Sequence, residues 1–346
     1  MVNLYSKTEE QVKDWLVQEG FKPFGAAQIF NWLYVHQVRD FSEMLNLSKD
    51  LRAKLAETFS LSLPGLGEVL RSEDGTTKFV CVLEDGKKIE TVLLSHEDHN
   101  TLCVSTQVGC AMACKFCLTA TLGLIRNLEP HEIVGQVLLA ETLLPEGQSL
   151  RNLVFMGMGE PLHNYDNLIL SLKILLNRRG LDFSWRRVTL STSGLIEGIK
   201  RFWAETEVSA MLAISLNGVT QEARAQLMPV AKKHQLEELI GACRELPLET
   251  RQRITFEYVL LAGVTDDLVS AKRLVALLNG IKAKVNLIPF NEHPDLPYKA
   301  PAPEQVRAFQ QYLLDRGLLC TVRKSRGRDV SAACGQLAAK ASPTAC

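Results

Sequence analysis

The segment CVSTQVGCAMACKFC, residues 103–117, contains four of the chain's nine cysteines and lies where the sequence pattern of the chain changes. Three of these cysteines, Cys110, Cys114 and Cys117, follow a C-x₃-C-x₂-C pattern. Thiolates bind soft metals, and a loop with this spacing can direct three sulfurs at one centre. A zinc finger and most iron–sulfur clusters take four protein ligands, so the pattern raises the question of what completes the site.

Two interpretations of the cysteine group stay open from the residues alone. A structural zinc site would need a distant fourth ligand. However, no second C-x₂-C or H-x₃-H pair appears, and the nearest histidine, His131, lies in a predicted helix. A [4Fe–4S] cluster held by three cysteines leaves one iron without a protein ligand. An open iron can bind a substrate or a cofactor.

From residue 101 onward, short apolar runs alternate with long amphipathic stretches, which is the pattern of parallel βα units. A doubly wound sheet is the rival architecture. Polar groups follow most of the runs, and in a βα barrel the loops after the strands form one mouth. We therefore predict a full or partial βα barrel over residues 101–340, with one site at its top face. The predicted strands are TLCVST, NLVFMG, RVTLST, AMLAISL, ITFEYVLL, KVNLIPF and LLCTVRK.

The regions that flank the barrel have other patterns. Residues 1–62 carry apolar side chains at helical spacing, which predicts a helical accessory domain. Residues 63–100 contain short β-prone runs separated by two Asp-Gly pairs, a strong hairpin signal, and predict a small antiparallel β extension. Residues 341–346 are interpreted as a tail.

The composition limits the class of protein. An odd number of cysteines, nine, in a chain of 346 residues does not resemble a secreted disulfide framework. No apolar run reaches the length of a membrane span, and the N-terminal residues lack the apolar region of a signal peptide. We therefore expect a cytoplasmic protein with no membrane partner. The net charge is zero, but basic patches at residues 323–328 and 178–187 are candidates for nucleic-acid contact.

The cysteine loop resembles that of the radical S-adenosylmethionine (SAM) superfamily, in which the open iron binds the amino and carboxylate groups of SAM. The stretch FMGMGEP, residues 155–161, is similar to the glycine-rich loop that follows the second strand in that superfamily. Glycine permits close approach of the backbone, and a carboxylate complements an ammonium group. The resemblance implies that the barrel is a partial (βα)6 barrel of the radical SAM type. It also implies a [4Fe–4S] cluster and SAM as cofactors, with reductive cleavage of SAM to a 5′-deoxyadenosyl radical.

A wider set of segments is similar to the bacterial dual-specificity 23S rRNA (adenine-C2) and tRNA methyltransferases. This resemblance implies a radical methyltransferase that acts on 23S rRNA and tRNA, with residues 1–62 contributing to RNA binding. It also implies an electron donor such as flavodoxin or ferredoxin, and we expect a monomer. The segments are TLCVSTQVGCAMACKFC, GMGEPLHNYDN, RRVTLSTSGL, VNLIPFN and VRKSRGRDVSAACGQLA.

The family resemblance implies roles for individual residues. Cys110, Cys114 and Cys117 would hold the cluster. Cys334 would be methylated first and then deliver that carbon, Cys103 would resolve the covalent intermediate, and Glu90 would accept the ring proton. Asn217 stands where a histidine is common in the family, which affects only the detail of cofactor binding. The SAM-binding residues would be Gly159, Glu160, Ser191, Ser215, Leu216, Asn217 and Asn291.

The chemistry explains why two cysteines lie far from the cluster group. Adenine C2 has no nucleophilic lone pair, so a methyl group must first be placed on sulfur and then added to the ring as a carbon radical. A second thiolate must afterwards attack that sulfur and release the RNA by thiol–disulfide exchange. Three alternatives stay open: an adenine-C8 rRNA methylase of the antibiotic-resistance type, a non-catalytic iron–sulfur electron carrier, and a zinc-dependent RNA-binding module.

Overall fold

The central sheet contains parallel strands in the order in which they occur along the chain. The computed structural model describes residues 1–250 and 252–338, so the predicted tail at residues 341–346 lies outside the described residues. The sheet has the strand order β14-β13-β12-β11-β10-β9-β6-β5-β4-β3. A doubly wound sheet changes direction at a topological switch point, whereas the parallel strands β6 to β14 do not. The prediction of a partial barrel is confirmed.

The barrel strands coincide with the seven apolar runs of the sequence. They are apolar because helices cover the outside of a parallel sheet and side chains fill the inside; every residue of β12, for example, is buried. The strands are β6 (Asn100–Cys103), β9 (Leu150–Phe155), β10 (Val188–Thr192), β11 (Met211–Ser215), β12 (Ile254–Leu260), β13 (Ala283–Pro289) and β14 (Cys320–Val322).

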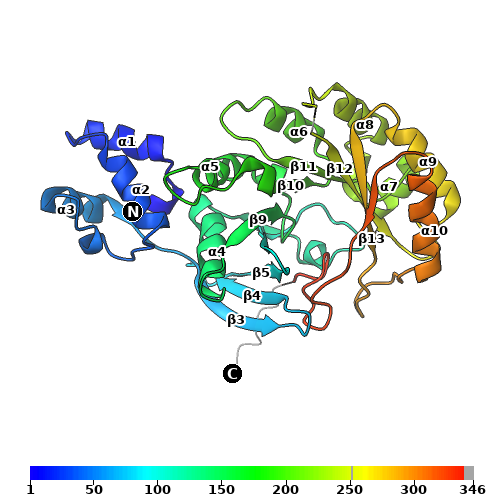
Figure 1. Cartoon of the computed structure of the whole chain (residues 1–346), viewed down its shortest axis with the longest axis horizontal. Helices are drawn as coiled ribbons and strands as arrows, with labels where there is room; N and C mark the ends of the chain where they lie inside the picture. The colour runs from blue at the N-terminus through cyan, green and yellow to red at the C-terminus, as the bar shows by residue number, and fades with distance from the viewer. Residues whose placement is uncertain (251, 339–346) are drawn as a thin grey trace.

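The crossover helices connect these strands and lie on the outer face of the sheet (Figure 1). The first of them begins at Pro130, which is favoured at the first helical position because its missing N–H would have no partner there. The crossover helices are α4 (Pro130–Thr142), α5 (Tyr165–Leu175), α6 (Ile196–Trp203), α7 (Gln221–Leu227), α8 (Leu236–Glu245), α9 (Leu268–Leu278) and α10 (Pro303–Leu314).

The β extension continues the barrel sheet. Its strands are β3 (Gly65–Arg71), β4 (Thr77–Val82) and β5 (Lys88–Ser95), and β5 pairs antiparallel with β6. The two Asp-Gly pairs form the turns on either side of β4, where Gly75 and Gly86 have φ values of +83° and +76°. The extension therefore shares one hydrogen-bonded sheet with the barrel.

The N-terminal region forms a helical unit beside the barrel (Figure 1). Ser6 Oγ lies 3.0 Å from His131 Nδ1 on α4, and Gln37 donates a hydrogen bond of 3.1 Å to Glu141 on the same helix. Among the described helices, none is both long and apolar enough to span a membrane. The N-terminal elements are β1 (Val2–Asn3), α1 (Glu9–Gln18), α2 (Gly25–Tyr34), α3 (Lys49–Thr58) and β2 (Phe59–Ser60).

The segment after β14 returns to the β extension and the cysteine loop. Lys78 Nζ donates to the Ser331 carbonyl at 3.3 Å, and the Ala338 N–H donates to Glu90 at 2.7 Å. Near the middle of the segment, the Leu118 N–H donates to the Gly335 carbonyl at 2.8 Å. These bonds place Cys334 beside the cysteine loop, although more than 200 residues separate them in the sequence.

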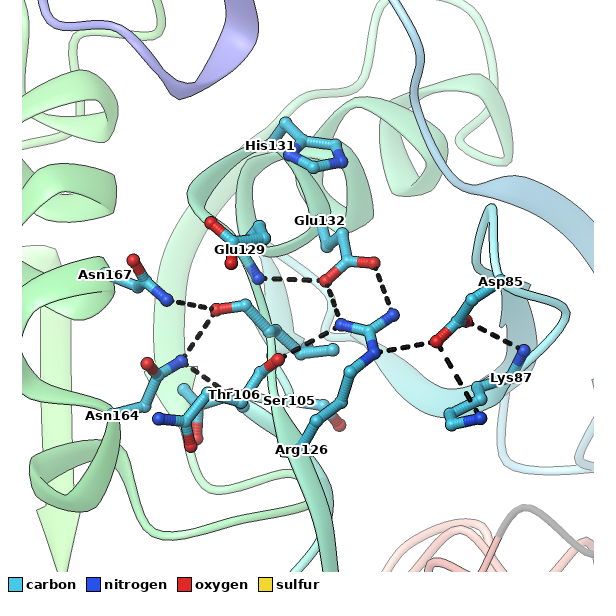
Figure 2. Close-up of polar contacts among 12 residues, drawn as sticks. Asp85, Lys87, Ser105, Thr106, Arg126, Glu129, His131, Glu132, Asn164 and Asn167 are labelled. Atoms are coloured by element: carbon cyan, nitrogen blue, oxygen red, sulfur yellow. Dashed lines mark hydrogen bonds and ion pairs between the residues drawn. The ribbon is translucent and has the colours of Figure 1, made fainter. Parts of the chain in front are cut away.

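A separate hairpin, β7 (Gln107–Gly109) with β8 (Leu124–Asn127), supports the cysteine loop. Figure 2 shows Arg126 of β8 between two carboxylates: it donates two hydrogen bonds, of 2.7 and 2.8 Å, to Glu132 of α4 and one of 2.8 Å to Asp85. Asn164 donates to the Leu128 carbonyl at 2.8 Å (Figure 2). The base of the cysteine loop is therefore bonded to three neighbouring elements.

Replacement of Arg126 by Met is expected to destabilise the protein. The change leaves the Glu132 carboxylate, whose side chain is 6% exposed, without its bidentate partner. We expect the free energy of unfolding, measured by urea denaturation, to fall by about 1–3 kcal/mol. The control is Arg307→Met, because Arg307 is exposed and, among the described residues, forms its ion pair with Glu304 of its own helix; there we expect a change below about 0.5 kcal/mol. Equal losses in the two variants would contradict this role of Arg126.

Candidate active site

The cysteine loop follows the first parallel strand and is held by backbone hydrogen bonds at both ends. The Cys110 N–H donates to the Gly123 carbonyl at 2.9 Å, and the Lys115 N–H donates to the Leu227 carbonyl of α7 at 2.9 Å. Gly109 has a φ of +75°, and a Cβ there would lie 1.8 Å from the Gly123 carbonyl oxygen. Only glycine fits at this position, so the loop can begin its turn directly before Cys110.

The three thiols of the loop line one pocket at the carboxyl end of the barrel strands. Burial raises the pKa of all three, that of Cys110 to about 12. Buried thiols that keep their protons become ligands when a metal displaces those protons. Cys110, Cys114 and Cys117 can therefore act as the sulfur ligands of a bound metal group.

The number of thiols indicates which metal group they suit. A structural zinc ion takes four protein ligands, whereas the loop brings three thiols to this pocket. A [4Fe–4S] cluster held by three cysteines leaves one iron open. The donor set of three thiols therefore fits such a cluster.

The glycine-rich segment after β9 forms the next wall of this pocket. Gly159 has a φ of +103°, and a Cβ there would lie 2.6 Å from the Cβ of Gln107, so the backbone passes close to β7. Glu160 is buried and accepts hydrogen bonds from the Ser193 N–H at 2.6 Å and the Leu162 N–H at 3.1 Å. Burial raises the pKa of Glu160, and the hydrogen bond from the Ser193 N–H opposes that change. A buried carboxylate of this kind is a suitable partner for an ammonium group.

Two orphaned polar atoms in the pocket wall indicate that it binds a polar ligand. Ser193 Oγ and Asn291 Oδ1 are buried without a hydrogen-bond partner in the described structure, although both residues line the pocket. Such atoms are rare in folded proteins unless a ligand or water satisfies them. With the Glu160 carboxylate, they provide groups that the amino-acid part of SAM can satisfy. The pocket therefore fits SAM as well as a cluster.

The structure brings together most of the residues that the sequence predicted for this pocket. Leu216 is different, because its side chain is fully buried in the hydrophobic core and does not line the pocket. Asn217 lies in the left-handed region, with a φ of +53°, and its Oδ1 accepts a hydrogen bond of 2.9 Å from the Val259 N–H. The predicted residues that line the pocket are Cys110, Cys114, Cys117, Gly159, Glu160, Ser191, Ser215, Asn217, Asn291 and Cys334.

A second pocket adjoins the first and contains both Cys103 and Cys334. Cys334 lines both pockets, and Asn291, which also lines both, donates a hydrogen bond of 3.3 Å to the Cys334 carbonyl. Both cysteines are free thiols. Cys334 therefore stands at the junction of the two pockets, where a group on its sulfur has access to either.

Two charged residues in this region were not singled out as site residues from the sequence. Arg323 lies 3.9 Å from Glu257, whose other carboxylate oxygen accepts a bond of 3.1 Å from Asn286. Burial raises the pKa of Cys103 to about 12 and the neighbouring Cys334 raises it further, while the Arg323 guanidinium opposes both effects. The sequence feature that could have indicated these residues is Glu257, because it places a carboxylate in the middle of the apolar strand ITFEYVLL.

Glu90 lies outside both pockets, in a neighbouring cavity. Its carboxylate forms an ion pair of 3.0 Å with Lys78 and accepts the bond from the Ala338 N–H. Its strand nevertheless pairs with the strand of Cys103, with Val92 opposite Cys103. The structure thus places Glu90 on β5 two residues from the partner of Cys103, with its carboxylate held by Lys78 and Ala338.

The basic run after β14 is divided between structural and exposed residues. Arg326 donates to the carbonyls of Ser95 at 2.7 Å and Asp74 at 2.8 Å, so it fixes the segment against the β extension. Lys324 and Arg328 are exposed, and Lys324 lines the second pocket. These two residues are the part of the run that can contact a large anionic ligand.

Comparison with known proteins identifies the family. Residues 2–61 match the model described as the ribosomal RNA large subunit methyltransferase N-terminal domain, and residues 104–275 match that of the radical SAM superfamily. A protein from Desulfosudis oleivorans, named dual-specificity RNA methyltransferase RlmN, is 51% identical over 334 residues, which cover 96% of this chain and 89% of the relative. A protein of the same name from Geobacter sulfurreducens is 47% identical and covers 98% of this chain and 93% of its own length.

A solved structure supports the same assignment. The crystal structure of a radical SAM methyltransferase from Sphaerobacter thermophilus superimposes with a TM-score of 0.92 and 42% sequence identity, and the match covers 98% of this chain and 100% of that chain. The agreement extends from the N-terminal helices to the end of the barrel. The chain therefore belongs to the dual-specificity RNA methyltransferase RlmN family, within the radical SAM superfamily.

Proposed function

We propose that this protein methylates C2 of an adenine in 23S rRNA and in tRNA, through a methylated Cys334 and a transient covalent bond to the RNA. The observation that carries the proposal is the position of Cys334 between the two pockets. One pocket has the three thiols and the Glu160 carboxylate, which suit the cofactors. The other has the second cysteine and the basic segment, which suit a nucleotide.

The cofactors of the family are a [4Fe–4S] cluster and SAM. When bound, they supply the methyl group and the 5′-deoxyadenosyl radical that removes one of its hydrogens. Cys110, Cys114 and Cys117 would hold the cluster, and Glu160 would face the ammonium group of SAM. The remaining contacts to SAM would come from Gly159, Ser191, Ser215, Leu216, Asn217 and Asn291, with Leu216 contributing through its backbone.

Cys334 and Cys103 divide the sulfur chemistry between them. Cys334 carries the methyl-derived carbon and presents it to the adenine. Enzyme and RNA become joined through sulfur and carbon when the ring gives up its proton to Glu90 and one electron, which the oxidised cluster would accept. Cys103 then attacks the sulfur of Cys334 and forms a disulfide. The electron pair of the broken carbon–sulfur bond leaves with the RNA carbon, which takes up a proton and becomes a methyl group.

Glu90 is proposed as the acceptor of the ring proton. Its carboxylate lies 3.0 Å from Lys78 Nζ, and its strand pairs with the strand of Cys103. The Ala338 N–H donates to one of its oxygens, so this hydrogen bond has to break before that oxygen takes up the proton. An adenine must leave its stack to enter the pocket, which is easiest in a loop.

The adenine-C8 methylase, the electron carrier and the zinc module are less favoured alternatives. The relatives that cover nearly the whole chain are named dual-specificity RNA methyltransferases. Neither an electron carrier nor a zinc module would need a second cysteine pocket next to the cofactor pocket. Mass spectrometry of the digested nucleoside distinguishes C2 from C8 methylation.

We further propose that the protein acts as a monomer and receives its electron from a flavodoxin or a ferredoxin.

The cluster proposal predicts the metal content of the protein. Anaerobically reconstituted protein should contain about four irons per chain, and replacement of Cys110, Cys114 and Cys117 together by Ala should abolish iron binding. The control is Cys320→Ala, which removes a buried thiol outside the pocket and should leave the iron content unchanged. Stoichiometric zinc in the unmodified protein, with no iron after reconstitution, would contradict the proposal.

The division of labour between the cysteines predicts a trapped intermediate. Cys103→Ala should still join the enzyme to RNA but should not release it, so denaturing electrophoresis should show a nuclease-sensitive RNA–protein band. Cys334→Ala should give no band, because it cannot carry the carbon. Cys81→Ala, which removes a buried thiol elsewhere in the sheet, should turn over normally. A band with Cys334→Ala instead would reverse the two assignments.

The RNA proposal predicts a change in salt dependence. Lys324 and Arg328 are exposed, whereas Arg326 is bonded to the β extension, so the test replaces Lys324 and Arg328 by Ala. The slope of log affinity against log salt should decrease by about 0.7–0.9 for each phosphate that the variant no longer neutralises. The matched control replaces Lys272 and Arg273, both exposed on α9, and should leave the slope unchanged. An unchanged slope in the first variant would place the RNA-binding surface elsewhere.

A further inference from the structure

Arg224, in α7, is the largest fully buried side chain among the described residues, with 0% exposure. Its Nη2 donates to the Ser193 carbonyl at 2.6 Å and lies 3.4 Å from the Ser215 carbonyl. Its Nε and Nη1 have no hydrogen-bond partner in the described structure. Arginine is rarely buried without an anion, because a guanidinium removed from water is stable only when its charge is balanced.

One glycine makes room for this side chain, and a second makes room for the backbone of Arg224. A Cβ at Gly194 would lie 2.8 Å from Arg224 Nη2, and a Cβ at Gly218 would lie 2.6 Å from the Arg224 backbone nitrogen. Both glycines lie in the loops just after β10 and β11, beside the cofactor pocket. The guanidinium therefore occupies a space that the backbone leaves open for it.

No carboxylate of the described chain balances the charge of Arg224. The groups whose negative charge would favour the charged guanidinium are the sulfurs of Cys114 and Cys243. Burial lowers the pKa of Arg224 to about 10, in agreement with a cation that lacks its counter-charge. The charge of Arg224 is therefore unbalanced within the protein itself.

The position of Arg224 indicates where the missing negative charge lies. The residues that it contacts, Ser193 and Ser215, line the pocket together with Cys114, while Arg224 itself lies behind that wall. The bond from the Lys115 N–H to the Leu227 carbonyl joins the cysteine loop to the same helix. A [4Fe–4S] core with two positive charges and three thiolate ligands has a net negative charge. One-electron reduction makes this charge more negative by one.

We propose that Arg224 is the buried counter-charge of the cluster, a positioning residue that stabilises its reduced form through the wall formed by Ser193 and Ser215. The inference rests on the proposed cluster at Cys110, Cys114 and Cys117. Net charge and nearby fixed charges are among the factors that set the potential of an iron–sulfur centre. Arg224 raises the reduction potential of the cluster, and the cluster in turn balances the charge of Arg224.

The first test measures the reduction potential of the reconstituted cluster without SAM or RNA, by a redox titration followed by electron paramagnetic resonance. Arg224→Met should lower the equilibrium constant for reduction at least tenfold, about 59 mV for a one-electron couple. Arg224→Lys keeps the charge and should retain most of the wild-type potential. Arg201→Met, which removes an exposed arginine of α6 that pairs with Asp166, is the control and should not change it.

The second test separates a counter-charge from a purely structural role. A structural arginine would stabilise the protein equally with and without the cluster. For a counter-charge, Arg224→Met should leave the melting temperature of the cluster-free protein unchanged or raised, because it removes an unbalanced buried charge. The same change should reduce the increase in melting temperature that cluster reconstitution gives.

The outcomes separate the two proposals. An unchanged potential in Arg224→Met with full iron content would overturn the counter-charge role and leave the cluster in place. A cluster-free Arg224→Met protein that does not fold, or that loses as much stability as the loaded protein does, would overturn it in favour of a structural role. Failure of the wild-type chain to bind any iron would instead overturn the proposed function.

Discussion

The carboxyl ends of the parallel strands all lie at one edge of the sheet, and the active site depends on this constraint. The cysteine loop follows β6, Gly159 and Glu160 follow β9, and Asn291 follows β13. Ser191 and Ser215 are at the ends of β10 and β11. Residues that are distant in the sequence therefore line one pocket because the strand order keeps their strands adjacent.

The partial barrel leaves space for the C-terminal segment. In the described structure β14 pairs only with β13, and the opposite edge of the sheet is the β extension. The segment after β14 crosses between these two parts and bonds to the extension through Lys78 and Glu90. A closed barrel would have no such passage, and Cys334 could not reach the junction of the two pockets from outside.

The sequence predicted the barrel well because its signals are local. Each parallel strand is a short apolar run, and the polar residues predicted to bind SAM end such a run or follow it within a few residues, so the two patterns can be read together. The Asp-Gly pairs likewise predicted turns that the structure contains, at Gly75 and Gly86. The ordered motifs then identified the family, since only members of that family are expected to carry all of them in this order.

The features that the sequence did not predict depend on contacts between distant segments. The strands β7 and β8 are too short to show a clear alternation of apolar and polar residues. Nothing in the sequences of β5 and β6 indicates that these two strands pair with each other. The basic run looked uniform, but Arg326 is bonded to backbone carbonyls that only the fold brings near. Arg224 gave no signal at all, because a lone arginine in a short helix usually faces water.

The attachment of Cys334 to its surroundings has a consequence for how the protein uses its substrates. The Gly335 carbonyl, directly after Cys334, accepts a hydrogen bond from the Leu118 N–H at the end of the cysteine loop. The Leu337 carbonyl accepts a second one, of 2.6 Å, from the Thr119 hydroxyl. Enzymes that transfer a group between distant sites often carry it on a long flexible arm. Under the proposed function the sulfur of Cys334 is instead attached to the wall between the two pockets, so its carbon would change partners while the sulfur travels little. Turnover would then depend on which molecule occupies each pocket and on the order in which these molecules bind and leave, and not on the motion of a carrier.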